Sequence, residues 1–405
     1  ALVLSSFSPI LVLKGRFKSN KYGLALRNGL VVFQFVISIV LIVAAIIVNQ
    51  QMKYMLGEKL GFKKDNVIEI ERADLLNTQS EAFKTELTKI PGVEMVSGTS
   101  AMPGMQNFFG VSFQQVNSNE SVTGRGIVVD DNFARTIALE LKEGRFFSKD
   151  FGTDSLSLIL NEKAVEEFGL LHPLGTLLTT PDNNLNTPGG KPYRYTVVGV
   201  VKDFHFQSLH QKITPLIFIN SAKFKNTANV FAVRVKADHI NNTLTGIEGQ
   251  WKKFVKNKPF HFSFLDQTLA DQYEAEQITL RLFTVFSSLA ILIACIGLLG
   301  LVAYTSQQRI REISIRKVLG ATSFKIAGML SKDFLRPVLI SSLIGFPVAW
   351  LVMHQWLQNF AYRVGISWWV FGLAGLLSVS IALLTISFQS VKAAISKPVK
   401  NLRSE

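Results

Sequence analysis

The chain has 405 residues, with 43 Lys and Arg against 29 Asp and Glu and a formal net charge of +14. Hydrophobic residues make up 48% of it, and its mean hydropathy of +0.27 is high for a water-soluble protein. A single cysteine, Cys295, excludes an intrachain disulfide framework, and no G-x-x-x-x-G-K-[ST] loop is present for ATP hydrolysis by that route.

Residues 1–29 carry five Lys and Arg and no acidic residue. They lack the basic start and the cleavage site of a signal peptide. The stretch "SSFSPILVLKGR" (5–16) resembles "AAISKPVKNLRS" (393–404), which follows an apolar run near the other end. We therefore expect 1–29 to be a cytoplasmic segment that follows a preceding helix, and the chain to be the C-terminal half of a longer, duplicated protein.

The first uncharged run, Leu30–Val48, predicts a transmembrane helix over 30–48, because about 20 apolar residues cross a bilayer. Residues 49–277 then form one large domain with strand–helix–strand patterns at both ends, over 66–100 and 229–266. These patterns predict an α+β sandwich assembled from two β-α-β units, with residues 105–225 as an inserted subdomain.

Inside the insertion, Asn161 and Gly169 predict the N-cap and the C-cap of a short helix. Catalytic patterns are weak. His205 and His210, with Asp203 nearby, could form a metal site, but their spacing of five fits neither a helix pair nor one strand face, and a loop with surface histidines is favoured.

The adjacent carboxylates Asp130 and Asp131 are interpreted as solvated turn residues. We predict no catalytic, cofactor-binding or metal-ligating residue in this chain, and no enzyme activity.

Three further uncharged runs, Leu282–Tyr304, Pro337–Trp356 and Ile366–Phe388, predict transmembrane helices over 278–304, 334–357 and 366–388. Four such runs in one chain disfavour buried core helices. Residues 266–286 contain no Gly or Pro, which predicts one continuous helix from the outer domain into the second membrane segment.

The positive charge lies on the segments expected beside the membrane. Residues 1–29, the connection 305–333 and the tail 389–405 are basic, so the positive-inside rule places them in the cytoplasm. With these segments inside, residues 49–277 form one large domain outside. They hold 25 Lys and Arg against 26 Asp and Glu, a net charge of −1. This near-neutral domain shows no basic face for nucleic acid.

The connection contains "QQRIREISIRKVLGAT" (307–322), which predicts a short helix ended by Gly320. Arg309, Glu312 and Arg316 form a charged stripe at helical spacing, with Glu312 and Arg316 in the favourable i,i+4 order. Topology-setting charge alone explains neither Glu312 nor the isoleucines beside it. The pattern favours a partner-docking elbow.

These residues resemble the signature of the FtsX-like, or MacB-type, permeases of ABC transporters, in which R-x-x-E-I-x-[IV]-R-[KR]-x-[IL]-G-A is typical. The stretches "EGRFFSKDF", "VVGVVKDFHFQSLHQKITPLIF" and "FLDQTLADQYEAEQ" resemble the outer-domain pattern of that family. The form with "KDFHFQSLH" is similar to members with two such modules in tandem.

The resemblance implies a multi-pass permease of the bacterial inner membrane that transmits motion to its outer domain, for export or efflux of peptides, drugs or lipoproteins. A separate ATP-binding subunit would hold ATP and Mg²⁺, so no cofactor is expected on this chain. A second permease module, as an internal tandem half or a homodimer, and an envelope partner are further expected partners. The coupling residues that the resemblance implies are Arg309, Glu312, Ile313, Arg316, Lys317, Leu319, Gly320 and Ala321.

Two other classes of function stay open. One is a transmembrane signalling protein that activates an envelope enzyme such as a cell-wall hydrolase. The other is a membrane-anchored enzyme, which the lack of a convergent site and the presence of four helices disfavour.

Overall fold

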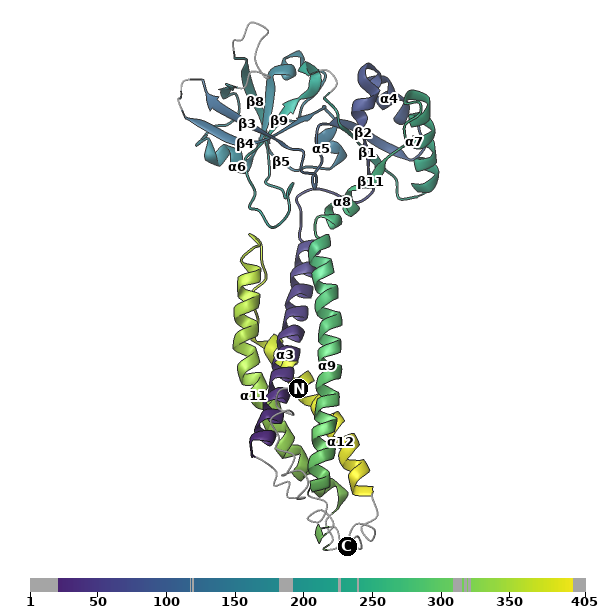
Figure 1. Ribbon diagram of the computed structural model, residues 1–405. Helices are drawn as coiled ribbons and strands as arrows, with labels where there is room; N and C mark the ends of the chain where they lie inside the picture. The colour runs from purple at the N-terminus through teal and green to yellow at the C-terminus, as the bar shows by residue number, and fades with distance from the viewer. Residues whose placement is uncertain are drawn as a thin grey trace, which may run out of the picture. The chain divides into compact units, whose positions relative to one another are not determined.

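The computed structural model describes residues 21–116, 118, 120–181, 192–224, 227–238, 240–308, 315–316, 319 and 322–395. The chain divides into two compact units (Figure 1). The helical unit contains most of α3 (Lys21–Gly57), α9 (Glu274–Gln308), α11 (Ser323–Leu357) and α12 (Trp368–Ile395). The outer domain comprises Met55–Glu274 together with Phe360–Tyr362.

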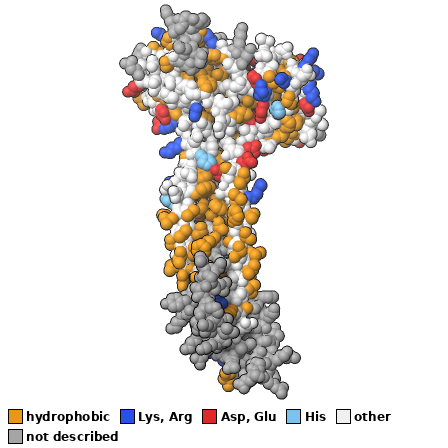
Figure 2. Space-filling view, in the orientation of Figure 1, with side chains coloured by type: hydrophobic (Ala, Val, Ile, Leu, Met, Phe, Trp, Pro, Cys, Tyr) orange, Lys and Arg blue, Asp and Glu red, His pale blue; other side chains and the backbone are white. Residues whose placement is uncertain are grey.

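Four helices in the described part of the chain are long and apolar enough to cross a membrane, over Leu26–Gly57, Glu274–Thr305, Phe334–Leu357 and Trp368–Ser387. Large apolar side chains cover their outer surface, as Figure 2 shows in orange. An exposed apolar surface of this extent is stable in lipid and not in water. The predicted four-helix membrane protein with a large outer domain between its first two helices is confirmed.

The helical unit has its own packed interior. Phe35, Leu298, Phe334 and Ile386, one from each helix, are buried in one cluster. The Ser341 hydroxyl of α11 donates a hydrogen bond to the Val32 carbonyl of α3 at 3.0 Å. Small polar side chains of this kind join helices where water is absent.

One half of the outer domain is a four-stranded antiparallel sheet in the order β11-β1-β10-β2. Its helices pack on one face of the sheet through Phe83 and Trp251, whose rings lie 5.8 Å apart (Figure 1). The two predicted β-α-β units are therefore present and share one sheet. The elements are β1 (Val67–Glu71), α4 (Ser80–Leu87), β2 (Val93–Thr99), β10 (Val230–Val235), α7 (Ile240–Phe254) and β11 (Phe262–Phe264).

The other half is a closed ring of six strands, in which β3, β4, β9, β6, β8 and β7 pair in turn and β7 pairs back with β3. Phe113 and Tyr195 are fully buried in its cluster of apolar side chains. Closure leaves this ring without an open edge. The strands are β3 (Phe109–Gln115), β4 (Ser121–Val129), β6 (Ser157–Asn161), β7 (Leu177–Thr179), β8 (Arg194–Val201) and β9 (Leu216–Asn220).

Shorter elements complete the outer domain. They are β5 (Leu141–Gly144), which pairs with β8, α5 (Phe133–Thr136), α6 (Glu162–Glu167), α8 (Leu265–Asp271), and the 3₁₀ helices η1 (Ala73–Gln79), η2 (Gly152–Leu156) and η4 (Ser221–Lys223).

The predicted caps of α6 are confirmed. The Asn161 side chain accepts a hydrogen bond from the Ala164 amide at 3.0 Å, and Gly169 has a φ of +63° just beyond the helix. Asn161 also accepts the Leu216 amide at 2.8 Å, so the cap ties α6 to the start of β9.

The predicted continuous helix over 266–286 is wrong. The chain forms α8 and then α9, with Gln272 and Tyr273 between them. Both side chains are held by distant backbone: Gln272 donates to the Gly104 carbonyl, and the Tyr273 hydroxyl accepts the Leu209 amide at 3.1 Å. These tertiary bonds override a local sequence that contains no helix breaker.

Candidate functional site

The predicted coupling elbow is described at only a few positions. Arg316 and Leu319 lie within the described residues, and the Leu319 amide donates to the Ile315 carbonyl at 3.0 Å, which is a helical i,i+4 bond. Ile315 and Leu319 are 55% and 80% exposed. Two exposed apolar side chains therefore flank Arg316. The other predicted residues, Arg309, Glu312, Ile313, Lys317, Gly320 and Ala321, lie outside the described residues.

The carboxylates Asp130 and Asp131 differ from each other. Asp130 is buried, so its interpretation as a solvated turn residue is wrong. It forms an ion pair with the equally buried Lys84 and accepts hydrogen bonds from the Ser97 hydroxyl and the Gly98 amide at 2.8 and 2.7 Å. Burial would lower the pKa of Lys84, but the Asp130 carboxylate raises it above its usual range. The Lys84 ammonium therefore keeps its charge, and the ion pair links α4 to the end of β4.

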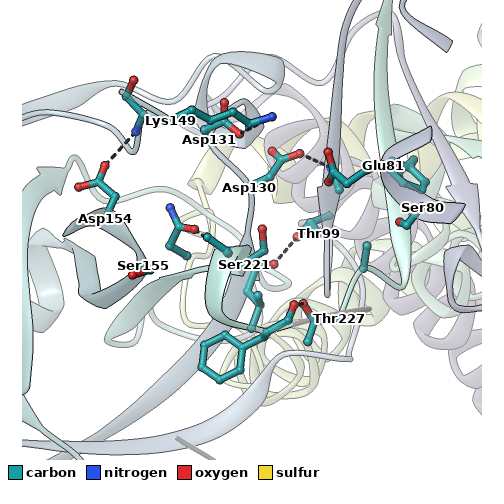
Figure 3. A pocket seen from close by; sticks show the side chains of 18 of the residues that line it. Ser80, Glu81, Thr99, Asp130, Asp131, Lys149, Asp154, Ser155, Ser221 and Thr227 are labelled. Carbon is teal, nitrogen blue, oxygen red and sulfur yellow. Dashed lines mark hydrogen bonds and ion pairs between the residues drawn. The ribbon is translucent and has the colours of Figure 1, made fainter. Parts of the chain in front are cut away.

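Asp130 lines a cavity of about 650 Å³ in the outer domain (Figure 3). Asp154, on another side of the cavity, accepts two hydrogen bonds from the guanidinium of Arg145 at 2.6 and 2.7 Å. Asp130 and Asp154 are thus neutralised by fixed partners. Hydroxyl groups line much of the remaining wall, from Thr78, Ser80, Thr99, Ser148, Ser155, Ser221 and Thr227.

The described lining of the cavity is rich in hydroxyl and carboxylate groups. Its lining contains no histidine and no cysteine, and its lysine, Lys149, lies 4.0 Å from the Asp131 carboxylate. A serine nucleophile needs a base within hydrogen-bond reach. In the described lining the Ser148 hydroxyl donates to the exposed Asp150 carboxylate at 2.9 Å, and the other lining hydroxyls suit the binding of a polar molecule.

His205 and His210 do not converge on a metal site. Among the described residues no three His, Cys, Asp or Glu side chains are close enough to hold an ion. Asp203 is turned to α6 instead, where its carboxylate accepts the Lys163 amide at 3.0 Å. The two histidines are half-buried against aromatic rings, and burial lowers the pKa of His205. In this loop the two imidazole rings pack against aromatic side chains.

Sequence reasoning did not single out Glu69, which is completely buried in β1. Its Oε2 accepts a hydrogen bond from Ser263 at 3.0 Å and another from Thr268, while no described residue bonds its Oε1. Burial is the main reason that its pKa rises to about 7. The sequence did contain a signal of this burial. Glu69 stands between two isoleucines in a strand that has apolar residues on both faces.

Comparisons with known proteins match both units. A family model described as the FtsX-like permease C-terminal region matches residues 284–398, and one described as the MacB-like periplasmic core domain matches residues 29–245, more than half of the chain. The "Macrolide export ATP-binding/permease protein MacB" of Bartonella henselae is 24% identical over 291 residues, or 68% of this chain. The chain spans 39% of the length of that relative.

Two solved structures are similar to about half of this chain. The periplasmic region of MacB from Actinobacillus actinomycetemcomitans is 16% identical, with 52% of this chain and 94% of that chain covered and a TM-score of 0.38. The extracellular domain of the ABC-type transporter YknZ from Gram-positive bacteria is 17% identical, with 49% and 98% covered and a TM-score of 0.36.

Proposed function

Because this chain belongs to the FtsX-like, MacB-type permeases of ABC transporters, we propose that it couples ATP hydrolysis in a separate ATP-binding subunit to movement of its outer domain. The family implies the ATP-binding partner and the membrane. The bacterial inner membrane is the compartment, and a second permease module completes the assembly, as a tandem half or as a second copy.

The observation that carries this proposal is the position of the charged segment 307–322. It lies inside the match to the permease family and between α9 and α11, two of the helices long enough to span a membrane. By sequence spacing, Arg309, Glu312 and Arg316 are predicted to form a charged stripe. Leu319 is exposed and is expected to supply an apolar contact. A partner with complementary charges is favoured by such a stripe.

Motion outside the membrane is favoured over passage of a polar substrate between the helices. The uncharged runs 282–304, 337–356 and 366–388 contain no Asp, Glu, Lys or Arg and a single histidine, His354. Intramembrane charges mark most ion and polar-substrate pathways. The cargo class is peptides, drugs or lipoproteins that the outer domain meets on its own side of the membrane.

The test is capture of a co-expressed ATP-binding subunit from the same organism by the full chain. Glu312→Lys and Arg316→Glu are each expected to reduce the captured subunit about tenfold or more, since each inverts one charge of the stripe. The control is Lys236→Glu, an equal charge inversion at an exposed position of the outer domain. Unchanged capture by both elbow variants would contradict this function and direct attention to an envelope-signalling role.

A further inference from the structure

The loop that follows β8 contains "FHFQSLH", residues 204–210, and the proposed function gives it no role. Phe204, Phe206 and Leu209 are buried in the outer domain, which anchors the loop firmly. His205 and His210 lie between these anchors and are half-buried. We call residues 204–210 the dock.

The chain that leaves α3 contacts the dock. The His205 amide donates to the Leu60 carbonyl at 2.8 Å, and the rings of Phe62 and Phe204 meet edge-on at 6.0 Å. Between them, Gly61 has a φ of +86°, and a Cβ at that position would lie 2.7 Å from the Cβ of Phe204. Only glycine allows this approach of the two backbones.

The chain that leads into α9 contacts the same loop. Tyr273 immediately precedes α9, is buried, and accepts the Leu209 amide with its hydroxyl. Its ring stacks on that of His210 at 6.2 Å. Tyr273 also marks the break between α8 and α9, so the dock holds the residue at which the helix restarts.

The third contact comes from the connection between α11 and α12. The amides of Ala361 and Tyr362 donate to the carbonyls of His210 and Leu209, each at 3.2 Å. The ring of Phe360, which is 3% exposed, stacks on His210 at 4.2 Å. The ring of Tyr362 meets that of His205 edge-on at 4.7 Å.

Phe360–Tyr362 belongs to the compact unit of the outer domain, although α11 and α12 belong to the helical unit. Two residues later the chain is back in the helical unit, where the Val364 amide donates to the buried side chain of Gln51 in α3 at 2.9 Å. α3 and α9 continue covalently into the outer domain, whereas α11 and α12 reach it through Phe360–Tyr362.

We propose that Phe360–Tyr362 is a non-covalent strap on the dock, through which displacement of α11 and α12 reaches the outer domain. The inference rests on the proposed function: α11 begins within the elbow 305–333, at Ser323, and is the helix that a partner bound there would move. Two backbone bonds and two ring contacts make a joint that holds its position yet can open and close again.

The test is amide hydrogen exchange of the full chain with its ATP-binding subunit in lipid nanodiscs, with and without nucleotide. Without nucleotide, Phe360→Ala combined with Tyr362→Ala is expected to speed exchange in peptides over 204–210 by about tenfold or more. Peptides over 230–235, in the buried strand β10, are expected to keep their exchange rates, which reports that the variant is folded. The control is Phe262→Ala, which removes a ring that contacts Phe260 and Phe264 in β11.

With nucleotide, the wild type is expected to change exchange over 204–210, and the strap variant is expected to lose that change while still capturing the ATP-binding subunit. Equal exchange over 204–210 in wild type and strap variant, in either condition, would overturn the strap and leave the proposed function standing. If exchange in the wild-type outer domain does not change on addition of nucleotide while the ATP-binding subunit is bound, the proposed function is overturned. The role of the strap in that function is then overturned with it.

Discussion

Replacement of the buried Glu69 by glutamine tests how the outer domain responds to pH. Glu69 lies in β1 opposite Ser263 of β11 and Ala232 of β10, with Thr268 of α8 bonded to the same carboxylate oxygen as Ser263. Glu71 and Asp266 add negative charge nearby. The ionised form is therefore disfavoured by burial first and by these neighbours second.

The magnitude follows from the pKa of Glu69, which rises from 4.5 to about 7 on folding. A raised carboxyl pKa means that the folded state holds the proton more tightly. The stabilisation is complete below pH 4.5 and is lost as the pH rises through 7. The pKa shift contributes about 3 kcal/mol in full to the free energy of unfolding. About 2 kcal/mol of this stabilisation is lost between pH 5 and pH 8. Glu69→Gln cannot ionise and removes this loss.

Hydrogen exchange of the full chain, corrected for the intrinsic pH dependence of amide exchange, measures the effect locally. Peptides over β1 and β11 of the wild type are expected to lose about 2 kcal/mol of opening free energy between pH 5 and pH 8. In Glu69→Gln the opening free energy of the same peptides is expected to be independent of pH over this range. Glu71→Gln, a carboxyl-to-amide change two residues along the strand, keeps Glu69 and is expected to retain the loss. Parallel pH profiles for wild type and Glu69→Gln would refute the reasoning.

The remaining predictions concern the stability of the outer domain, measured by thermal unfolding of the full chain in detergent. Asp130→Asn leaves the Lys84 ammonium buried without a counter-charge and is expected to cost about 3 kcal/mol. Gly175→Ala is expected to cost about 1 kcal/mol, because φ there is +80° but the space is open. Gly144→Ala is expected to cost clearly more, because φ is +79° and the new Cβ would lie 2.4 Å from a backbone carbonyl oxygen. Gly110→Ala, in open space with no positive φ, is the control for both.

The matched control for the buried ion pair is Lys89→Met, which breaks the exposed pair of Lys89 with Glu86 and is expected to change stability little. Equal losses for Asp130→Asn and Lys89→Met would show that burial of the first pair has no energetic consequence. Equal losses for the three glycine variants would contradict the backbone argument.

The sequence alone was sufficient for features that depend on local physics. A bilayer needs about 20 consecutive apolar residues, so four uncharged runs predicted α3, α9, α11 and α12. The N-cap of α6 at Asn161 was predictable because capping is a bond between a residue and its third neighbour. The strand–helix–strand patterns at both ends of the outer domain were predictable because strand and helix periodicities differ.

Tertiary structure alone decided the features that join residues distant in the sequence. The parallel pairing of β4 with β9 closes the six-stranded ring, and no local pattern encodes it. Asp130 is buried because Lys84, 46 residues away, meets it, although adjacent carboxylates are usually solvated. The histidines of the dock receive their partners from residues near 60, 273 and 360, so their role could not follow from their spacing. Burial and pairing depend on which distant segments meet, and that is set by the packing of the whole domain.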